Sequence, residues 1–260
     1  MFKFNFENSE SECNWNAKKP EKSTCMVPLI VHTPHMHSKI ENDDVSSLKL
    51  KEGQEMFFFK NKDCNDYKFS LLPNVYEGGC ELWESTVDLL NFLSRNRKLM
   101  ENQTVLDLGC GSGLLGIFAL QMGAEKVIFQ DFNAKVIENY LFKNIKMNFS
   151  LDFAQKFERC KFVSGDWNDA NLVHQLCKPT IILSSETLYD ISSYDALICL
   201  FEKILALGGK VFLASKLYYF GVGGSVDAFI ERSSSIFSSE IIYTVSDCGV
   251  GRRILLLQRK

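Results

Sequence analysis

Apolar and polar positions along residues 100–216 alternate between two periods. Five short apolar runs are separated by longer stretches in which apolar residues recur at helical spacing. The runs are TVLDLG (104–109), KVIFQD (126–131), KFVSGD (161–166), TIILSSE (180–186) and GKVFLASK (209–216), and the helical stretches are 114–122, 133–147, 168–177 and 193–206. Strands that alternate with helices predict right-handed crossovers and a mainly parallel sheet with helices on both faces.

The C-terminal part of the chain departs from this alternation. A helix near 225–236 is followed by EIIYTV (240–245) and RRILLLQ (252–258), with the turn-forming segment SDCGVG between them. Two consecutive strands with a short link pair antiparallel. We therefore predict an α/β fold, a Rossmann-like sheet of seven mostly parallel strands with a C-terminal antiparallel hairpin.

The N-terminal part divides into a polar arm and an extension of the sheet domain. Residues 1–45 are rich in Asn, Ser, Glu and Lys, so we predict a flexible arm before a single domain over 46–260. The arm contains HTPHMH after Cys25, and His32, His35 and His37 are either metal ligands or part of a polar linker. We favour the linker and predict no metal site, because no further group of ligand residues follows.

Residues 46–100 form the predicted strand and helix extension. SSLKLKEGQEMFFFK and YKFSLLP are typical of short strands around turns. VYEGGCELWESTVDLLNFL then passes from a Gly-Gly turn into an amphipathic helix, in which Leu82, Thr86, Leu89 and Leu93 share one face.

Composition indicates a globular protein in a reducing compartment. The 260 residues are 46% apolar and 23% charged, and the net charge of −3 gives no general electrostatic reason to bind nucleic acid or an anionic membrane. Nine cysteines are present without a CxxC pair, which predicts free thiols. No apolar run approaches the ~18 residues of a membrane span. We expect a soluble protein of the cytoplasm, the nucleus or both.

The segment LDLGCGSGLLG has two interpretations. Gly111, Gly113 and Gly116 form the GxGxxG of a nicotinamide-dinucleotide turn, whereas Asp107, Gly109, Gly111 and Gly113 form a DxGxGxG turn that suits S-adenosylmethionine. Either turn follows a strand and opens a helix, which is where open α/β sheets bind their ligands.

Acidic residues at three successive strand ends decide between the two cofactors. Asp131 can accept both hydroxyls of a ribose and serves either one. Asp107 precedes the glycines, where a dinucleotide turn favours apolar residues, whereas a carboxylate there can meet the ammonium group of S-adenosylmethionine. Asp166 and Trp167 can bind the adenine amino group and stack on its ring. The sequence therefore predicts S-adenosylmethionine as the cofactor.

Several motifs resemble one family of methyltransferases. SETLY matches the acidic-x-x-aromatic motif of lysine and histidine protein methyltransferases of class I, the seven-strand class. VYEGGCELWEST, LDLGCGSGLLGIFALQMGA with FQDFN, and LASKLYYFGVGG resemble the protein-histidine N-methyltransferases, whose known substrate is a histidine in the third protein of the large ribosomal subunit. The resemblance runs from about Leu71 to the C-terminus, and the family pattern has a histidine where this chain has Tyr218.

The resemblance implies a cofactor site on successive strand ends and on the first helix. Its predicted residues are Leu82, Trp83, Glu84, Ser85, Thr86, Asp107, Gly109, Gly111, Gly113, Asp131, Phe132, Asn133, Gly165, Asp166, Trp167 and Ser185. It also implies a protein substrate, here a large-subunit ribosomal protein, and a monomeric enzyme that requires neither a nucleic acid nor a membrane.

The acceptor side is predicted from residue types. A carboxylate that accepts the N–H of an imidazole would fix its tautomer and stabilise the cation formed on methylation. Glu186 is the first candidate for this catalytic role and Glu77 the second, and the family resemblance implies that Glu186 and Tyr189 border the acceptor channel. Lys216, Tyr219 and Phe220 are predicted to contact the substrate.

Three other functions remain open from the sequence. A protein-lysine methyltransferase shares the SETLY motif. A nicotinamide oxidoreductase would use the GxGxxG pattern, although no Tyr-x-x-x-Lys pair stands out. A non-catalytic scaffold with the same fold would bind a ribosomal or chaperone partner only.

Overall fold

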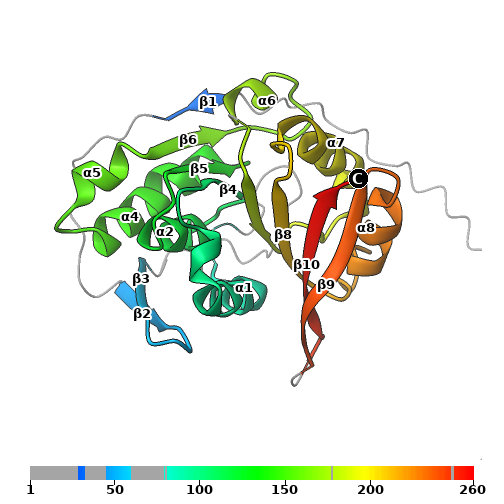
Figure 1. Cartoon of the computed structure of the whole chain (residues 1–260), viewed down its shortest axis with the longest axis horizontal. Coiled ribbons are helices and arrows are strands. Elements are labelled where there is room, and N and C mark those ends of the chain that lie inside the picture. Colours follow the sequence, from blue (N-terminus) through cyan, green and yellow to red (C-terminus); the bar gives the residue numbers. More distant parts are fainter. Residues whose placement is uncertain (1–28, 33–44, 60–78, 80, 177, 247–248) are drawn as a thin grey trace, which may run out of the picture.

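The computed structural model describes residues 29–32, 45–59, 79, 81–176, 178–246 and 249–260. Within them lies an eight-stranded sheet with the order β1-β6-β5-β4-β7-β8-β10-β9 (Figure 1). The strands are β1 (Ile30–Val31), β4 (Thr104–Leu108), β5 (Lys126–Asp131), β6 (Cys160–Ser164), β7 (Ile181–Ser185), β8 (Lys210–Lys216), β9 (Phe237–Val245) and β10 (Arg252–Arg259). Strands β6, β5, β4, β7 and β8 are parallel neighbours, as the alternating pattern predicts.

The central strands are apolar throughout because both faces of the sheet are buried. Neighbouring residues of one strand enter opposite cores: Val105 belongs to one apolar cluster and Leu106 to the other. The same alternation separates Val127 from Ile128 on the adjacent strand. These central strands thus contribute side chains to two separate hydrophobic cores.

Helices cover these two cores (Figure 1). Helices α1 (Glu84–Arg95), α2 (Leu114–Gln121) and α4 (Phe142–Asn148) pack on one face, and α6 (Leu172–Gln175), α7 (Tyr194–Ile204) and α8 (Val226–Ser233) pack on the other. The remaining helical segments are α3 (Ala134–Val136), the π-helical turn η4 (Ile137–Leu141), α5 (Phe153–Phe157) and the 3₁₀ turns η3 (Arg97–Leu99) and η5 (Ile191–Ser193).

Two of the predicted helices differ in extent from the observed ones. The stretch 133–147 forms α3, η4 and α4 in succession, with a π-helical turn where one continuous α-helix is predicted. The stretch 168–177 holds only the four-residue α6, because Asp166 and Asp169 accept bonds from backbone amides two residues later and form turns.

The C-terminal hairpin is confirmed. Strand β10 lies between β8 and β9 and is antiparallel to both, with a bulge between Ile254 and Leu255 on the β9 side. The inserted strand places the last residues of the chain inside the sheet, where Leu255 and Leu257 are buried in the core.

The N-terminal region contributes one strand that the sequence does not predict. Residues Ile30–Val31 lie in the segment predicted as a flexible arm, yet they form β1 and pair antiparallel with β6. The adjacent His32 is 7% exposed, and its ring nitrogens hydrogen-bond to Ser164 (2.8 Å) and Glu138 (3.1 Å). These contacts fasten the strand to the open edge of β6 and give His32 a structural role.

The other residues of the possible metal site, His35, His37 and Cys25, lie outside the described residues. The part of the chain that the structure describes contains no cluster of side chains able to hold a metal ion.

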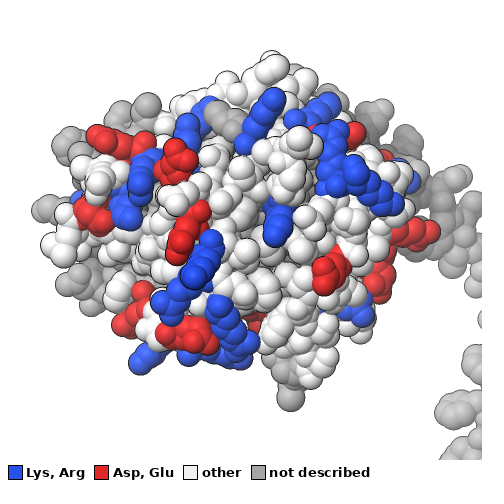
Figure 2. All heavy atoms as spheres, viewed as in Figure 1, with Lys and Arg blue, Asp and Glu red and all other residues white. Residues whose placement is uncertain are grey.

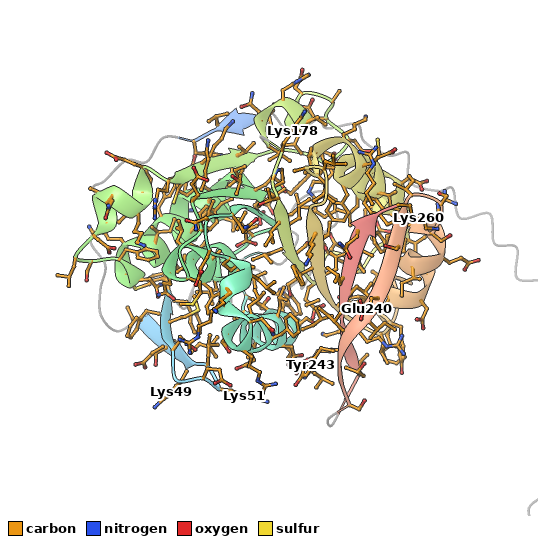
Figure 3. All side chains as sticks on the ribbon, in the orientation of Figure 1. Lys49, Lys51, Lys178, Glu240, Tyr243 and Lys260 are labelled. Atoms are coloured by element: carbon orange, nitrogen blue, oxygen red, sulfur yellow. The ribbon has the colours of Figure 1, made fainter. Side chains whose placement is uncertain are left out.

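A separate two-stranded sheet precedes α1. Strands β2 (Val45–Lys49) and β3 (Glu55–Phe59) pair antiparallel, as SSLKLKEGQEMFFFK predicts, whereas YKFSLLP lies outside the described residues. The side chain of Asn148 exchanges hydrogen bonds with the backbone of Phe57, at 3.0 and 2.7 Å, and anchors this hairpin to α4. Lys49 and Lys51 project outward from it (Figure 3).

The exterior has no dominant charge on the face drawn in Figure 2. Basic and acidic side chains both occur over this face, in keeping with the net charge of −3. Among the described helices, none has the length and apolar character that crossing a membrane requires.

Gly116 provides a test of how closely α2 packs on the sheet. A Cβ atom there would approach Phe129 and lie 2.9 Å from Val127 Cγ1, so Gly116→Ala overpacks the core. We expect the free energy of unfolding to fall by about 1–3 kcal/mol, as for other overpacked cores. Urea denaturation measures this change. Gln121→Ala, at the half-buried end of the same helix, is the control and should change stability by about 0.5 kcal/mol or less. Equal stability of Gly116→Ala and wild type would contradict the close packing.

Candidate active site

The candidate site lies where the strand order reverses. From β4 the chain moves to β5 and β6 on one side and later returns to β7 on the other side. The loops after β4 and β7 therefore diverge and leave a crevice at the carboxyl ends of the strands, the usual ligand position in such sheets. Four predicted groups meet at this edge: Asp107 to Gly113, Asp131, Gly165 to Trp167, and Ser185 with Glu186.

The glycine turn is shaped first by the packing of the protein itself. Gly109, Gly111 and Gly113 have φ values of +64°, +52° and +77°, which side chains other than glycine rarely adopt. A Cβ at Gly109 would lie 2.8 Å from Thr187 Cγ2, and one at Gly111 would lie 2.8 Å from the carbonyl oxygen of Gly79. Gly79 thus lies directly against the turn. Contact of these glycines with the cofactor stays a prediction.

Asp131 holds the glycine turn against the end of β5. Its carboxylate accepts hydrogen bonds from the amides of Gly111 (2.8 Å) and Asn133 (2.9 Å), and the residue is 5% exposed. A carboxylate fixed by two backbone donors has a defined orientation. The structure therefore places Asp131 and Asn133 at the predicted site and gives Asp131 a structural role in addition to the predicted ribose contact.

Asp107 is almost completely buried, although it is predicted to contact a ligand. It is 1% exposed, and its carboxylate accepts a hydrogen bond from the amide of Gly116 at 2.8 Å. Burial raises the pKa of Asp107 to about 8; the Gly116 amide lowers it, and the charge of Asp131 raises it further. The observed partner of Asp107 is thus the start of α2, and its contact with an ammonium group stays a prediction.

The environment of Asp107 also tests which ligand fits. Burial and the neighbouring Asp131 disfavour a negative charge on Asp107, so a pyrophosphate would bring further negative charge to a place that disfavours it. A cationic sulfonium and ammonium would instead favour the ionised form of Asp107. The glycine turn therefore fits S-adenosylmethionine better than a dinucleotide.

Trp167 is positioned by a residue that the sequence analysis missed. Its indole N–H donates to the side-chain oxygen of Gln130 (3.0 Å), and the Gln130 amide donates to the Gly165 carbonyl (2.9 Å). The ring lies beside Gly109, 3.9 Å from where its Cβ would be. The sequence signal that could have revealed this residue is a glutamine within the apolar run KVIFQD. The structure shows that its side chain is fully buried.

Asp166 does not point freely toward the predicted adenine position. Its carboxylate accepts from the backbone and side-chain amides of Asn168, at 2.8 and 2.9 Å, and so caps a turn.

Glu186 lies at the centre of a partly buried hydrogen-bond network. Its carboxylate accepts from the hydroxyl groups of Ser85 on α1 and Tyr219 on the loop after β8. Its backbone has the left-handed φ of +57°, uncommon for a residue with a side chain and often associated with functional sites. The Tyr219 hydroxyl also pairs with Ser215 Oγ at 3.0 Å. Burial, with the neighbouring Glu186 charge, raises the pKa of Tyr219 far above its usual value, so this hydroxyl remains a donor.

Further contacts join α1 to the ends of β7 and β8. Thr86 Oγ1 donates to Ser185 Oγ at 3.0 Å, and Lys216 Nζ lies 5.3 Å from the centre of the Trp83 ring, a cation–π distance. The rings of Tyr189 and Tyr219 meet edge to face at 6.4 Å.

The remaining predicted residues lie in other surroundings. Glu84 pairs with Arg252 of β10 at 3.4 Å, so its observed partner is not part of the glycine turn. Leu82 packs on the hydrophobic core, Phe132 is half-buried, and Phe220 is 77% exposed. Glu77 lies outside the described residues.

Comparison with known proteins identifies the family. Residues 74–220, more than half of the chain, match the model of a protein family described as lysine methyltransferase. The chain belongs to this methyltransferase family. It is 41% identical over 180 residues to the histidine protein methyltransferase 1 homolog of Dictyostelium discoideum, an alignment that covers 69% of this chain and 56% of the relative. It is 30% identical over 267 residues to histidine protein methyltransferase 1 of Schizosaccharomyces pombe, covering 85% and 72%.

The chain spans about half the length of several curated relatives that it matches. Among solved structures, the magnesium protoporphyrin IX methyltransferase of Synechocystis with bound S-adenosylmethionine is similar, with a TM-score of 0.52 and 18% identity over 66% of this chain and 77% of that chain. The predicted class I methyltransferase fold is confirmed. S-adenosylmethionine, the methyl donor of the family, is confirmed as the predicted cofactor.

The pKa of Asp107 predicts how stability depends on pH. The folded protein keeps a proton on Asp107 up to about pH 8, whereas the unfolded chain loses it near the ordinary value of 3.8. The free energy of unfolding should therefore fall as the pH rises between these values. Asp107→Asn retains an oxygen acceptor for Gly116 and has no proton to lose, so this contribution should disappear. Urea denaturation between about pH 4 and pH 8 measures it.

The exposed Asp152 supplies the control for this experiment. Asp152→Asn should keep the pH dependence of the wild type. An Asp107→Asn variant with that same dependence would show that Asp107 is ionised in the folded protein.

Proposed function

We propose that this protein transfers a methyl group from S-adenosylmethionine to a ring nitrogen of a histidine in a protein substrate. The supporting observation is the carboxylate of Glu186, held by the Ser85 and Tyr219 hydroxyls beside the crevice of the sheet. The histidine protein methyltransferases that the chain resembles give independent support. The sequence motifs point further to a large-subunit ribosomal protein as substrate, and to a monomeric enzyme of the cytoplasm, the nucleus or both.

The chemistry of the acceptor agrees with this arrangement. An imidazole has a pKa of about 6.5 and is mostly neutral near pH 7, so one ring nitrogen already carries a free lone pair. The site must orient the ring and shield it from water, which is how positioning contributes to catalysis. When bound, S-adenosylmethionine supplies an electrophilic methyl group on a sulfonium.

Glu186 can perform the orienting step. An ionised carboxylate offers about four acceptor positions, and the two hydroxyl donors leave some of them available. A histidine N–H that donates to Glu186 places the lone pair on the opposite ring nitrogen. The carboxylate also stabilises the positive charge that the ring gains on methylation. Tyr189 and Tyr219, which meet edge to face, provide an apolar wall for a flat ring.

A lysine acceptor is the second candidate, because the matching family is described as lysine methyltransferase. A lysine arrives protonated, with a pKa of about 10.4, and must lose its proton before it can attack. Glu186 would then have to accept a proton in full. A histidine acceptor does not require this step, and the curated relatives named histidine protein methyltransferase also favour histidine.

The product of the reaction tests the proposal directly. The purified protein, incubated with radiolabelled S-adenosylmethionine and purified large-subunit ribosomal proteins from cells lacking it, should yield labelled methylhistidine on acid hydrolysis. Labelled methyllysine would transfer support to the second candidate. Cofactor binding without transfer to any ribosomal protein would contradict the proposed substrate.

Replacing Glu186 tests its role at the acceptor. Glu186→Gln presents an amide N–H₂ where an ionised oxygen accepts and removes the negative charge. We expect kcat to fall by about 10²-fold or more, the usual effect of losing one positioned proton acceptor. The increase in Tm caused by S-adenosylmethionine should remain, because this carboxylate faces the acceptor.

Glu202→Gln on α7 is the control, since Glu202 pairs with Arg259 at 3.4 Å away from the crevice. It should retain wild-type turnover. Full turnover of Glu186→Gln on the same ring nitrogen would remove Glu186 from the mechanism.

A further inference from the structure

Four large apolar side chains are exposed at the mouth of the candidate site. Tyr218, Phe220 and Val222, on the loop after β8, are 47%, 77% and 45% exposed. Ile191, on the loop after β7, is 51% exposed. We call these four residues the aromatic rim. Large apolar side chains that remain together at a surface are typical of interaction sites.

The two loops of the rim are joined to each other. Asp190 and Gly223 form an isolated β-bridge, and a Cβ at Gly223 would lie 3.6 Å from Ile191 Cδ1. The amide of Gly224 donates to the carbonyl of Tyr189 at 3.0 Å. Residues from the two loops therefore form one continuous surface.

The rim is held in its exposed position by a tight turn. The Tyr219 amide donates to the Gly224 carbonyl at 2.8 Å, and the Gly223 amide donates to the Tyr219 carbonyl at 3.1 Å. A side chain at Gly224 would collide with the backbone carbonyls of Leu188 and Tyr189, so the turn lies directly against that segment. Because this backbone is fixed, the exposed rings have little freedom to fold back onto the protein.

Alternation along the turn connects the rim to the candidate active site. Tyr219 points inward and donates to Glu186, whereas its neighbours Tyr218 and Phe220 point outward. The two outward rings meet edge to face, with centroids 4.8 Å apart. The same short segment thus holds the candidate catalytic carboxylate and presents an apolar surface directly beside it.

We propose that the aromatic rim is the docking surface for the polypeptide that carries the acceptor residue. Its partner is an extended peptide segment with apolar side chains on both sides of the acceptor. This inference rests on the proposed function, since it assumes that a protein chain enters the crevice. Preorganised aromatic residues are the usual anchors of protein interfaces, because burying them costs little conformational entropy.

Two labelled peptides of 13 residues provide the probe. Each peptide contains one central histidine. The leucine peptide has leucine two positions before and two positions after this histidine, and the serine peptide has serine at both of these positions. Fluorescence anisotropy with S-adenosylhomocysteine present should show that the wild type binds the leucine peptide about tenfold more tightly, the factor expected for burying apolar side chains. Phe220→Ser should reduce this tenfold preference to about onefold.

Leu207→Ser is the matched control. Leu207 is 102% exposed but lies before β8, at the opposite end of that strand from the crevice. This variant should keep the full preference for the leucine peptide. A preference that survives in Phe220→Ser, or that the wild type lacks, would overturn the proposal. Self-association of the wild type that Phe220→Ser abolishes would also overturn it, because the occupant would then be a second copy of the chain.

A methylation assay on the same peptides separates this inference from the proposed function. Rim-dependent binding of the leucine peptide without methylhistidine formation would contradict the acceptor assignment alone. Formation of methylhistidine at equal kcat/KM from both peptides, in wild type and in Phe220→Ser, would contradict the docking surface alone.

Discussion

Two buried carboxylates organise the centre of this molecule. Asp131 accepts from the amide of Gly111, and Asp107 accepts from the amide of Gly116, so the turn after β4 is fixed both to β5 and to its own helix. The bond from Gly116 satisfies a backbone donor in the first turn of α2, where no intrahelical partner exists. Burial, together with the charge of the nearby Asp131, raises the pKa of Asp107 to about 8. The same arrangement that stabilises the turn therefore disfavours further negative charge beside it.

The second organising group is Glu186, which joins three segments that are distant in the sequence. Ser85 belongs to α1, Glu186 follows β7, and Tyr219 follows β8. Ser85 is fully buried and Tyr219 is half-buried, and their two hydroxyl groups hold the carboxylate in position. The loop that supplies Tyr219 also supplies the exposed rings beside it. The proposed acceptor carboxylate and the proposed docking surface are therefore connected through one short turn.

Glycine has more than one purpose in this fold. The glycines after β4 and the one at Gly116 are required by contacts with Thr187, Gly79 and Phe129 of the protein itself. Gly224 permits the turn of the rim to lie against the backbone after β7. A glycine pattern alone thus indicates that the backbone closely approaches another group. Whether that group is a cofactor or another part of the protein depends on the fold.

The sequence by itself determined the parallel sheet, the antiparallel C-terminal hairpin and the cofactor, because these follow from local periodicity and from residue types at strand ends. It also identified Glu186 as the candidate carboxylate. Only the tertiary structure decided that Asp107 turns toward Gly116, that Gln130 holds Trp167, and that Ser85 and Tyr219 meet at Glu186. It likewise decided that Ile30–Val31 completes the edge of the sheet. Such contacts join residues up to more than a hundred positions apart, and their partners depend on how elements pack rather than on any local pattern.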